Sequence, residues 1–153
     1  MAERSAPPAG AAVRAKGRPS RVVVVDGMGG GLGEELVRRL RAAQPAVEIF
    51  ALATNSTATE RMVKAGANRG ATGENAICRS VALGDVILGP IGIVIAHSML
   101  GEITPAIAEA VLAAPGKRVV IPLQNEHLTL AGVEPMPLSK MLDKAIELTA
   151  ELL

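Results

Sequence analysis

The feature that most constrains this chain is a run of glycines between an apolar strand and a helix. Residues 21–25 have the sequence RVVVV, which is apolar on both faces, as in a central strand of a parallel sheet. The segment DGMGGGLG follows at residues 26–33, and apolar side chains then recur at helical spacing through residue 40. A strand, a glycine turn and a helix in this order form the first unit of a doubly wound α/β fold.

The rest of the chain continues to alternate between strand and helix patterns. Further strands are expected at residues 47–52, 85–89 and 118–122, with an edge strand at 127–131. The first helix should end before Pro45, and later helices are expected over residues 57–65, 74–82, 104–114 and from 138 to the C-terminus. This order predicts a three-layer α/β fold: a doubly wound, mostly parallel sheet of about five strands with helices on both faces.

Cap residues predict where two of these helices begin. Thr57 and Glu60 have the spacing of a capping box, so the second helix is expected to start there. Thr104 followed by Pro105 is typical of an N-cap and a first helical residue.

The first twenty residues differ in composition from the rest of the chain. Residues 1–20 mix Pro, Gly, Ala and Arg without any apolar period, which predicts a disordered N-terminal tail. Residues 21–153 then form a single domain.

Composition argues against several classes of partner. Sixteen Lys+Arg balance fifteen Asp+Glu, and the chain has one Phe, no Trp and no Tyr, so we expect no binding to nucleic acid. The longest stretch without charge, residues 86–101, is interrupted by Gly and Pro, so we expect no membrane span. The single cysteine, Cys78, and the lack of a secretory signal favour a cytoplasmic protein. Scattered His and Cys residues predict no metal site.

The glycine segment is the predicted ligand site. Gly27, Gly31 and Gly33 have the spacing G-x-x-x-G-x-G, which differs from the dinucleotide motif G-x-G-x-x-G, and no P-loop lysine follows. Gly29 and Gly30 complete the loop, whose N–H groups at the helix start suit a phosphate. The cofactor stays unidentified, with a nucleotide or dinucleotide favoured. The alternative is a strand-to-helix turn that needs glycine only for packing.

A dinucleotide site also needs an acid near the end of the second strand, roughly 20 residues beyond the loop, to bind ribose hydroxyls. That acid is missing, because residues 51–56 have the sequence ALATNS. Thr54, Asn55 and Ser56 could receive a phosphate with help from Arg61, which favours a phosphorylated ribose. Alternatively, these residues only cap the second helix. An adenine could stack on an aromatic ring only if Phe50 reaches it.

Five motifs in order, VVVVDGMGGGLG, ALATNSTAT, MVKAGANRGATGENAI, DVILGPIGI and SMLGEITP, resemble a bacterial family of small proteins catalogued only as a domain of unknown function. The resemblance covers residues 21 to about 135. It implies a Rossmann-like fold and assigns no substrate. The family more often has Gln at the position of Met28 and Asn at that of His97.

Other polar side chains are expected at the same edge of the sheet. Asn75 follows a small polar loop, and His97, Ser98 and Glu102 follow the third expected strand. Loops at the carboxyl ends of parallel strands share one crevice, so these groups are candidates to line the ligand site. His97, Ser98 and Glu102 are also weak candidates for catalysis, since they have the residue types of a nucleophilic triad without its sequence context. Asp26 is interpreted as a turn former or as a ligand of Mg²⁺ or a ribose hydroxyl.

Three functions remain open at this point. The first is a domain that binds a nucleotide or a phosphorylated small molecule at the glycine loop. The second is a small enzyme that uses this ligand as a cofactor at a subunit interface, which leaves a homo-oligomer open. The third is an interaction module whose glycine loop is purely structural.

We expect no hydride transfer of the short-chain dehydrogenase type. That chemistry uses a tyrosine acid with a lysine four residues on, and the chain has no Tyr. The check is the absorbance of a reduced nicotinamide cofactor during incubation with simple carbonyl substrates. Steady cofactor oxidation would contradict the expectation and make His97 the first acid to examine.

Overall fold

The computed structural model describes residues 16–123 and 128–153. The strands are β1 (Arg21–Asp26), β2 (Glu48–Ala53), β3 (Arg69–Thr72), β4 (Val86–Pro90) and β5 (Lys117–Ile121). The α-helices are α1 (Gly31–Ala43), α2 (Ser56–Ala65), α3 (Glu74–Ser80), α4 (Pro105–Ala113) and α5 (Leu138–Glu151). Two 3₁₀ turns, η1 (Val81–Leu83) and η2 (Ile91–Val94), flank β4.

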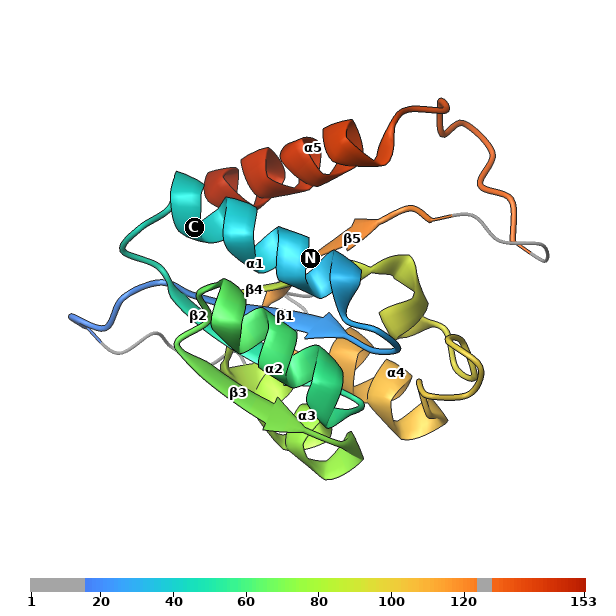
Figure 1. Cartoon of the computed structure of the whole chain (residues 1–153), viewed down its shortest axis with the longest axis horizontal. Helices are drawn as coiled ribbons and strands as arrows, with labels where there is room; N and C mark the ends of the chain where they lie inside the picture. The colour runs from blue at the N-terminus through green and yellow to red at the C-terminus, as the bar shows by residue number, and fades with distance from the viewer. Residues whose placement is uncertain (1–15, 124–127) are drawn as a thin grey trace, which may run out of the picture.

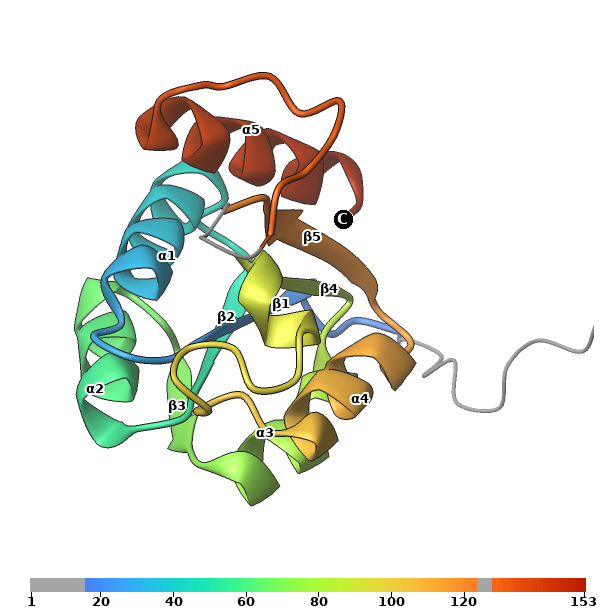
Figure 2. The same cartoon turned by 90° about the vertical axis from the view of Figure 1, so that its right-hand side faces the viewer.

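The five strands form one parallel sheet in the order β3-β2-β1-β4-β5. Helices α1, α2 and α5 share one apolar core with the sheet, and the opposite face packs against α3 and α4 (Figures 1 and 2). The expected three-layer, doubly wound fold is therefore confirmed, and it is Rossmann-like.

Strand β1 lies at the centre of this arrangement. Residues 22–25 are fully buried, and β1 pairs with β2 on one side and with β4 on the other. Valine suits this position because its branched side chain packs well on both faces of a pleated strand. The glycine segment that follows β1 is thereby placed in the middle of the carboxyl edge of the sheet.

Helix α1 is held against α5 as well as against the sheet. The Arg39 guanidinium donates to the carbonyl oxygen of Ser139 (2.7 Å) and to the carboxylate of Asp143 (2.8 Å). The two helices lie next to each other in Figure 1. The C-terminal helix therefore supports the helix that begins at the glycine loop.

One predicted strand does not form and one strand was not predicted, although the expected number of about five strands was right. The predicted edge strand at 127–131 does not form: His127 lies outside the described residues, and within 128–131 only Leu128 makes an isolated bridge. The strand that completes the five-stranded sheet is instead β3, which pairs with β2 and has mostly exposed side chains. Such a short polar strand has no apolar pattern that sequence reasoning could detect.

One helix cap was also predicted wrongly. Helix α2 begins at Ser56, and the N-cap is Asn55, whose side-chain oxygen accepts from the Ala58 N–H (2.9 Å). Thr57 and Glu60 therefore do not form the expected capping box. The Thr104 cap with Pro105 at the start of α4 is confirmed, because the Thr104 hydroxyl oxygen accepts from the Ile107 N–H (3.2 Å).

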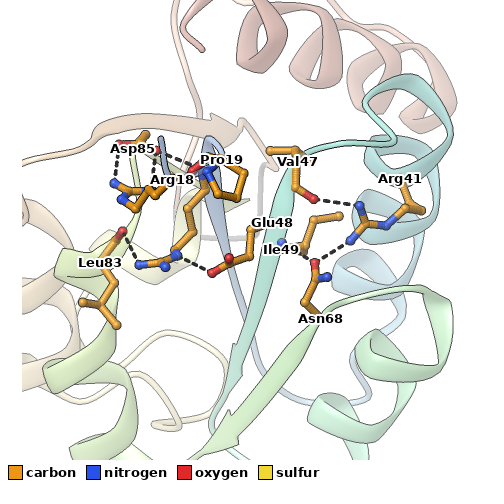
Figure 3. Close-up of polar contacts among 10 residues, drawn as sticks. Arg18, Pro19, Arg41, Val47, Glu48, Ile49, Asn68, Leu83 and Asp85 are labelled. Atoms are coloured by element: carbon orange, nitrogen blue, oxygen red, sulfur yellow. Dashed lines mark hydrogen bonds and ion pairs between the residues drawn. The ribbon is translucent and has the colours of Figure 1, made fainter. Parts of the chain in front are cut away.

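The predicted tail makes contacts before residue 21. Asp85 binds the Arg18 guanidinium through both carboxylate oxygens (3.0 and 3.2 Å) and accepts from the Arg21 N–H (2.8 Å), as Figure 3 shows in part. The Ser20 carbonyl also accepts from the Glu48 N–H (2.9 Å). Contact with the domain therefore begins near residue 18, and residues 1–15 of the predicted tail lie outside the described residues.

A second network joins the amino end of β2 to α1 and to the residue before β3. The Asn68 side-chain oxygen accepts from the Ile49 N–H (2.8 Å) and from the Arg41 guanidinium (2.6 Å), which also donates to the Val47 carbonyl (2.7 Å) (Figure 3). Polar groups thus fasten the amino edge of the sheet, and the carboxyl edge is where the loops gather. Across residues 16–123 and 128–153, no helix is both long and apolar enough to cross a bilayer.

We expect Arg18→Ala to lower the melting temperature by roughly 2–4 °C, because it removes a half-buried ion pair from a domain of this size. Differential scanning calorimetry measures the change. Arg79→Ala, at an exposed position on α3, is the matched control and should leave the melting temperature unchanged. Equal melting temperatures for the Arg18 variant and the native chain would contradict a stabilising role for this contact.

Candidate functional site

The glycine loop lies where the direction of winding reverses. From β1 the chain builds β2 and β3 on one side, and it then returns to build β4 and β5 on the other. In open parallel sheets the crevice at the carboxyl ends of the strands around this reversal is the usual ligand site. Three loops meet here: residues 27–30 after β1, residues 54–55 after β2 and residues 91–104 after β4.

Three glycines of the loop are required by packing. Gly27, Gly30 and Gly33 are buried, and a Cβ on any of them would lie closer than 3.0 Å to another residue. At Gly30 that neighbour is the Cα of Ala58, at 2.5 Å, and the φ of +74° also favours glycine. Packing alone therefore explains why these three positions are glycine.

Gly29 and Gly31 differ from these three. Both are exposed, neither has a positive φ, and the nearest atom to an added Cβ is a nitrogen of the Arg61 guanidinium, at 3.8 Å. Among the residues that the structure describes, the N–H groups of Gly29, Gly31 and Leu32 have no hydrogen-bond acceptor. Packing therefore does not explain glycine at these two positions, which surround open donors at the start of α1.

Asp26 closes the base of the loop. Its side chain is buried, and Oδ2 accepts from the Gly33 N–H (2.7 Å), so the carboxyl group satisfies one of the N–H donors of the first turn of α1. Burial raises the pKa of Asp26, which hydrogen bonds from the Gly27 and Gly33 backbones partly offset, and the charge of Glu102 raises it further. Its role as a turn former is thereby established in the structure.

Glu102 lies across the loop. Its Oε1 accepts from the Thr54 hydroxyl (2.6 Å) and from the Asn55 amide (3.1 Å), and both carboxylate oxygens lie near the Met28 N–H (3.2 and 3.1 Å). The hydrogen bond from Thr54 is the largest effect and lowers the pKa of Glu102; burial opposes it, and the hydrogen bonds from Asn55 and Met28 lower the pKa further. An ionised carboxylate from the loop after β4 thus joins the carboxyl ends of β1 and β2.

The Asn55 side chain is fully used in holding these loops. Its oxygen caps α2, while its nitrogen donates to the Met28 carbonyl (2.7 Å) and to Glu102. Asn55 therefore positions the glycine loop, and the capping interpretation of this residue is confirmed. Ser56 is exposed and makes no hydrogen bond through its side chain within the described parts of the chain.

Arg61 from α2 reaches over the exposed glycines. One guanidinium nitrogen donates to the Gly29 carbonyl (2.7 Å), and the other two atoms of the fork bind Glu34 on α1 (2.7 and 2.5 Å). The positive charge is thus held within reach of Gly29 and Gly31 by a carboxylate on the neighbouring helix.

The loop after β4 has an unusual backbone. His97, Met99 and Leu100 have φ values of 68°, 56° and 56°, a left-handed conformation that is uncommon for residues with a Cβ. Fully buried Ile103 anchors the base of this loop, and the Ile103 carbonyl accepts from the His97 N–H (2.6 Å). The strain is consistent with a segment whose exact course matters for the placing of Glu102.

The three weak catalytic candidates do not meet. The Ser98 hydroxyl donates to the Gly92 carbonyl (2.5 Å), the His97 side chain is exposed, and Glu102 binds Met28, Thr54 and Asn55 instead. Asn75 lies exposed on α3 at the β3 side of the sheet, and none of its contacts joins it to the glycine loop.

An open hollow lies on the β4 side of the glycine loop. It has a volume of about 510 Å³, which includes adjoining solvent space, and the glycine loop forms one wall. Apolar side chains that sequence reasoning did not single out, Pro90, Met99 and Leu123, form the other. Apolar side chains are also typical of the core, so the sequence did not indicate that these residues line a site.

The sheet order and the glycine loop at its reversal define a Rossmann-like α/β protein. Residues 21–153 match the model of a family described as "Domain of unknown function (DUF3842)", and the chain belongs to this family. A comparison with curated proteins finds no match.

We expect the stability of Asp26→Asn relative to the native protein to increase as the pH rises. The pKa of Asp26 is raised above its ordinary value of 3.8, so the folded state holds the proton more tightly than the unfolded chain. The resulting stabilisation is complete below the unfolded pKa and is lost as the pH rises through the folded pKa. An asparagine oxygen can still accept from the Gly33 N–H, and its side chain does not ionise.

The measurement is urea unfolding of both proteins between pH 4 and pH 8. Glu109→Gln, at an exposed position on α4, is the control for the loss of a carboxyl group and should show no such trend. A difference between Asp26→Asn and the native protein that stays constant across this range would contradict the raised pKa.

Proposed function

We propose that the protein binds a nucleotide or a phosphorylated small molecule, with the phosphate on the N–H groups of Gly29, Gly31 and Leu32. One observation carries this proposal: these three donors are open in the described structure and lie at the start of a helix, two of them on exposed glycines that have no side chain. Glycine permits a close approach of the backbone to a ligand, and N–H groups at a helix start favour a phosphate.

The charges around the loop support an anion on its exposed face. The N-terminus of α1 contributes a partial positive charge, and the Arg61 guanidinium lies next to the same glycines. Three carboxyl groups lie around the loop: Asp26 is buried beneath it, Glu102 is bonded to Thr54 and to the Met28 N–H on the β2 side, and Glu34 is paired with the Arg61 guanidinium. Because Arg61 is already paired with a carboxylate, the open N–H groups at the start of α1 are the main attraction for an anion.

The surroundings suit the other parts of a nucleotide. Thr54, with Asn55 as its positioning neighbour, lies where a sugar would follow the phosphate on the β2 side. Phe50 does not reach the site, because its ring lies 4.4 Å from the guanidinium carbon of Arg21, which opens β1 at the opposite edge of the sheet. A base attached to a sugar on the β2 side would therefore pack on aliphatic side chains, and the apolar hollow lined by Pro90, Met99 and Leu123 lies on the other side of the phosphate position.

The purely structural alternative explains only part of the loop. It accounts for Gly27, Gly30 and Gly33, whose Cβ positions are occupied by neighbouring residues, and it leaves Gly29 and Gly31 without a reason. We also propose a cytoplasmic location, which the single cysteine favours.

The test is the double variant Gly29→Ala/Gly31→Ala. Each added methyl group has room in the fold, so we expect native circular dichroism, and each would stand beside the open N–H groups, so we expect at least tenfold weaker binding. Isothermal titration calorimetry with ribonucleoside mono-, di- and triphosphates and sugar phosphates measures the affinity.

Gly30→Ala is the contrasting variant, since a methyl group there would meet the Ala58 backbone at 2.5 Å and should destabilise the fold. No binding of any of these compounds to the native protein at millimolar concentration would refute the proposal. The same holds if the folded double variant binds as tightly as the native protein, and the interaction module would then be the better hypothesis.

A further inference from the structure

A Rossmann-like nucleotide site needs a carboxylate near the end of the second strand to bind the ribose. The β2–α2 segment of this chain supplies none, but a carboxylate from a distant loop lies at the same place. Glu102 lies 48 residues along the chain from Thr54, and its Oε1 accepts from the Thr54 hydroxyl at the first position after β2. It also contacts the N–H of Met28, one residue before Gly29. Glu102 is therefore next to the proposed phosphate position and on its β2 side.

The two oxygens of this carboxylate are used unequally. Oε1 accepts hydrogen bonds from Thr54 and Asn55, so most of its acceptor positions are occupied. The one contact of Oε2 is with the Met28 N–H, at 3.1 Å, and Oε1 shares this donor. An ionised carboxylate has about four acceptor positions, so Oε2 has capacity for hydroxyl donors. The side chain is only partly buried, which leaves it accessible to a ligand.

On these contacts, and resting on the proposed function above, we propose that Glu102 binds the ribose hydroxyls of the nucleotide and selects ligands with a free 2′-hydroxyl. A hydroxyl donates to an ionised carboxylate in a strong, charge-assisted hydrogen bond. A 2′-deoxy sugar lacks one donor, and a 2′-phosphate would place negative charge beside the carboxylate.

The surrounding charges favour the diol over a 2′-phosphate. Arg61, which sequence reasoning considered as a partner for a phosphorylated ribose, has two guanidinium nitrogens on Glu34 and the third on the Gly29 carbonyl. It is held over the glycines and not beside Thr54. The donors that surround Glu102 are a hydroxyl, an amide and a backbone N–H, none of which carries a charge to balance a second anion.

The loop that carries Glu102 is suited to hold the carboxylate in this place. Its backbone has left-handed residues at 97 and 99–101, and the buried side chain of Ile103 follows Glu102 directly. A carboxylate on such a constrained segment needs little reordering when a ligand binds, which favours selectivity.

The experiment compares ADP, GDP, CDP and UDP with their 2′-deoxy counterparts by isothermal titration calorimetry, on the native protein and on Glu102→Gln. The native protein should bind the preferred ribonucleotide about tenfold more tightly than its deoxy form. In Glu102→Gln this ratio should fall to about two or less, because the amide oxygen still accepts from Thr54 but carries no charge. Adenosine 2′,5′-bisphosphate should bind the native protein more weakly than AMP, and the variant should reduce that difference.

Glu109→Gln on the exposed face of α4 is the matched control and should keep the native ratio. Equal affinity of the native protein for the ribo and deoxy forms would overturn the role of Glu102 and leave phosphate binding at the glycine loop intact. This comparison needs no variant, so it holds even if Glu102→Gln unfolds. An unchanged ratio in a folded Glu102→Gln would also overturn the role. No binding of any ribonucleotide would overturn the role of Glu102, whereas the proposed function would be overturned only if the sugar phosphates also failed to bind.

Discussion

The arrangement of the whole protein depends on the complete burial of β1. Because Val22 to Val25 have no contact with solvent, the backbone N–H and C=O groups of this strand need partners on both sides, and β2 and β4 supply them. The strand therefore occupies the centre of the sheet, and the reversal of winding falls beside it. The polar residues that follow β1, Asp26 and the glycines, are in this way brought to the place where the loops of three strands meet.

The glycine loop combines two roles that its sequence does not separate. Gly27, Gly30 and Gly33 let the turn pack against Thr54, Ala58 and Met62, which fixes the distance between α1 and its neighbours. Gly29 and Gly31 touch none of these residues and leave backbone donors open to solvent. A close-packed base with open N–H groups on its outer side fits the proposed anion site at the start of α1. The two roles are physically linked, because the packed glycines determine where the open donors point.

Glu102 connects three loops that are distant in sequence. Its contacts with Met28, Thr54 and Asn55 join the ends of β1 and β2 to the loop after β4. The left-handed residues before Glu102 show that the backbone of this loop is strained. Asp26 and Glu102 lie near each other, but their environments differ, since burial raises the pKa of Asp26 while hydrogen bonds lower that of Glu102. The site thus contains one carboxyl group whose pKa is raised and one whose pKa is lowered.

Much of this protein could be predicted from local patterns in the sequence. The buried strand β1, the amphipathic helices α1 and α5, the Thr104 cap and the position of the glycine loop all follow from residues within one or two turns of one another. The tertiary structure alone decided the rest. Strand β3 exists because β2 offers it a pairing edge, and Glu102 completes the end of β2 across 48 residues of chain. Periodicity and capping depend on near neighbours, whereas strand pairing and side-chain contacts between loops depend on which distant segments the fold brings together.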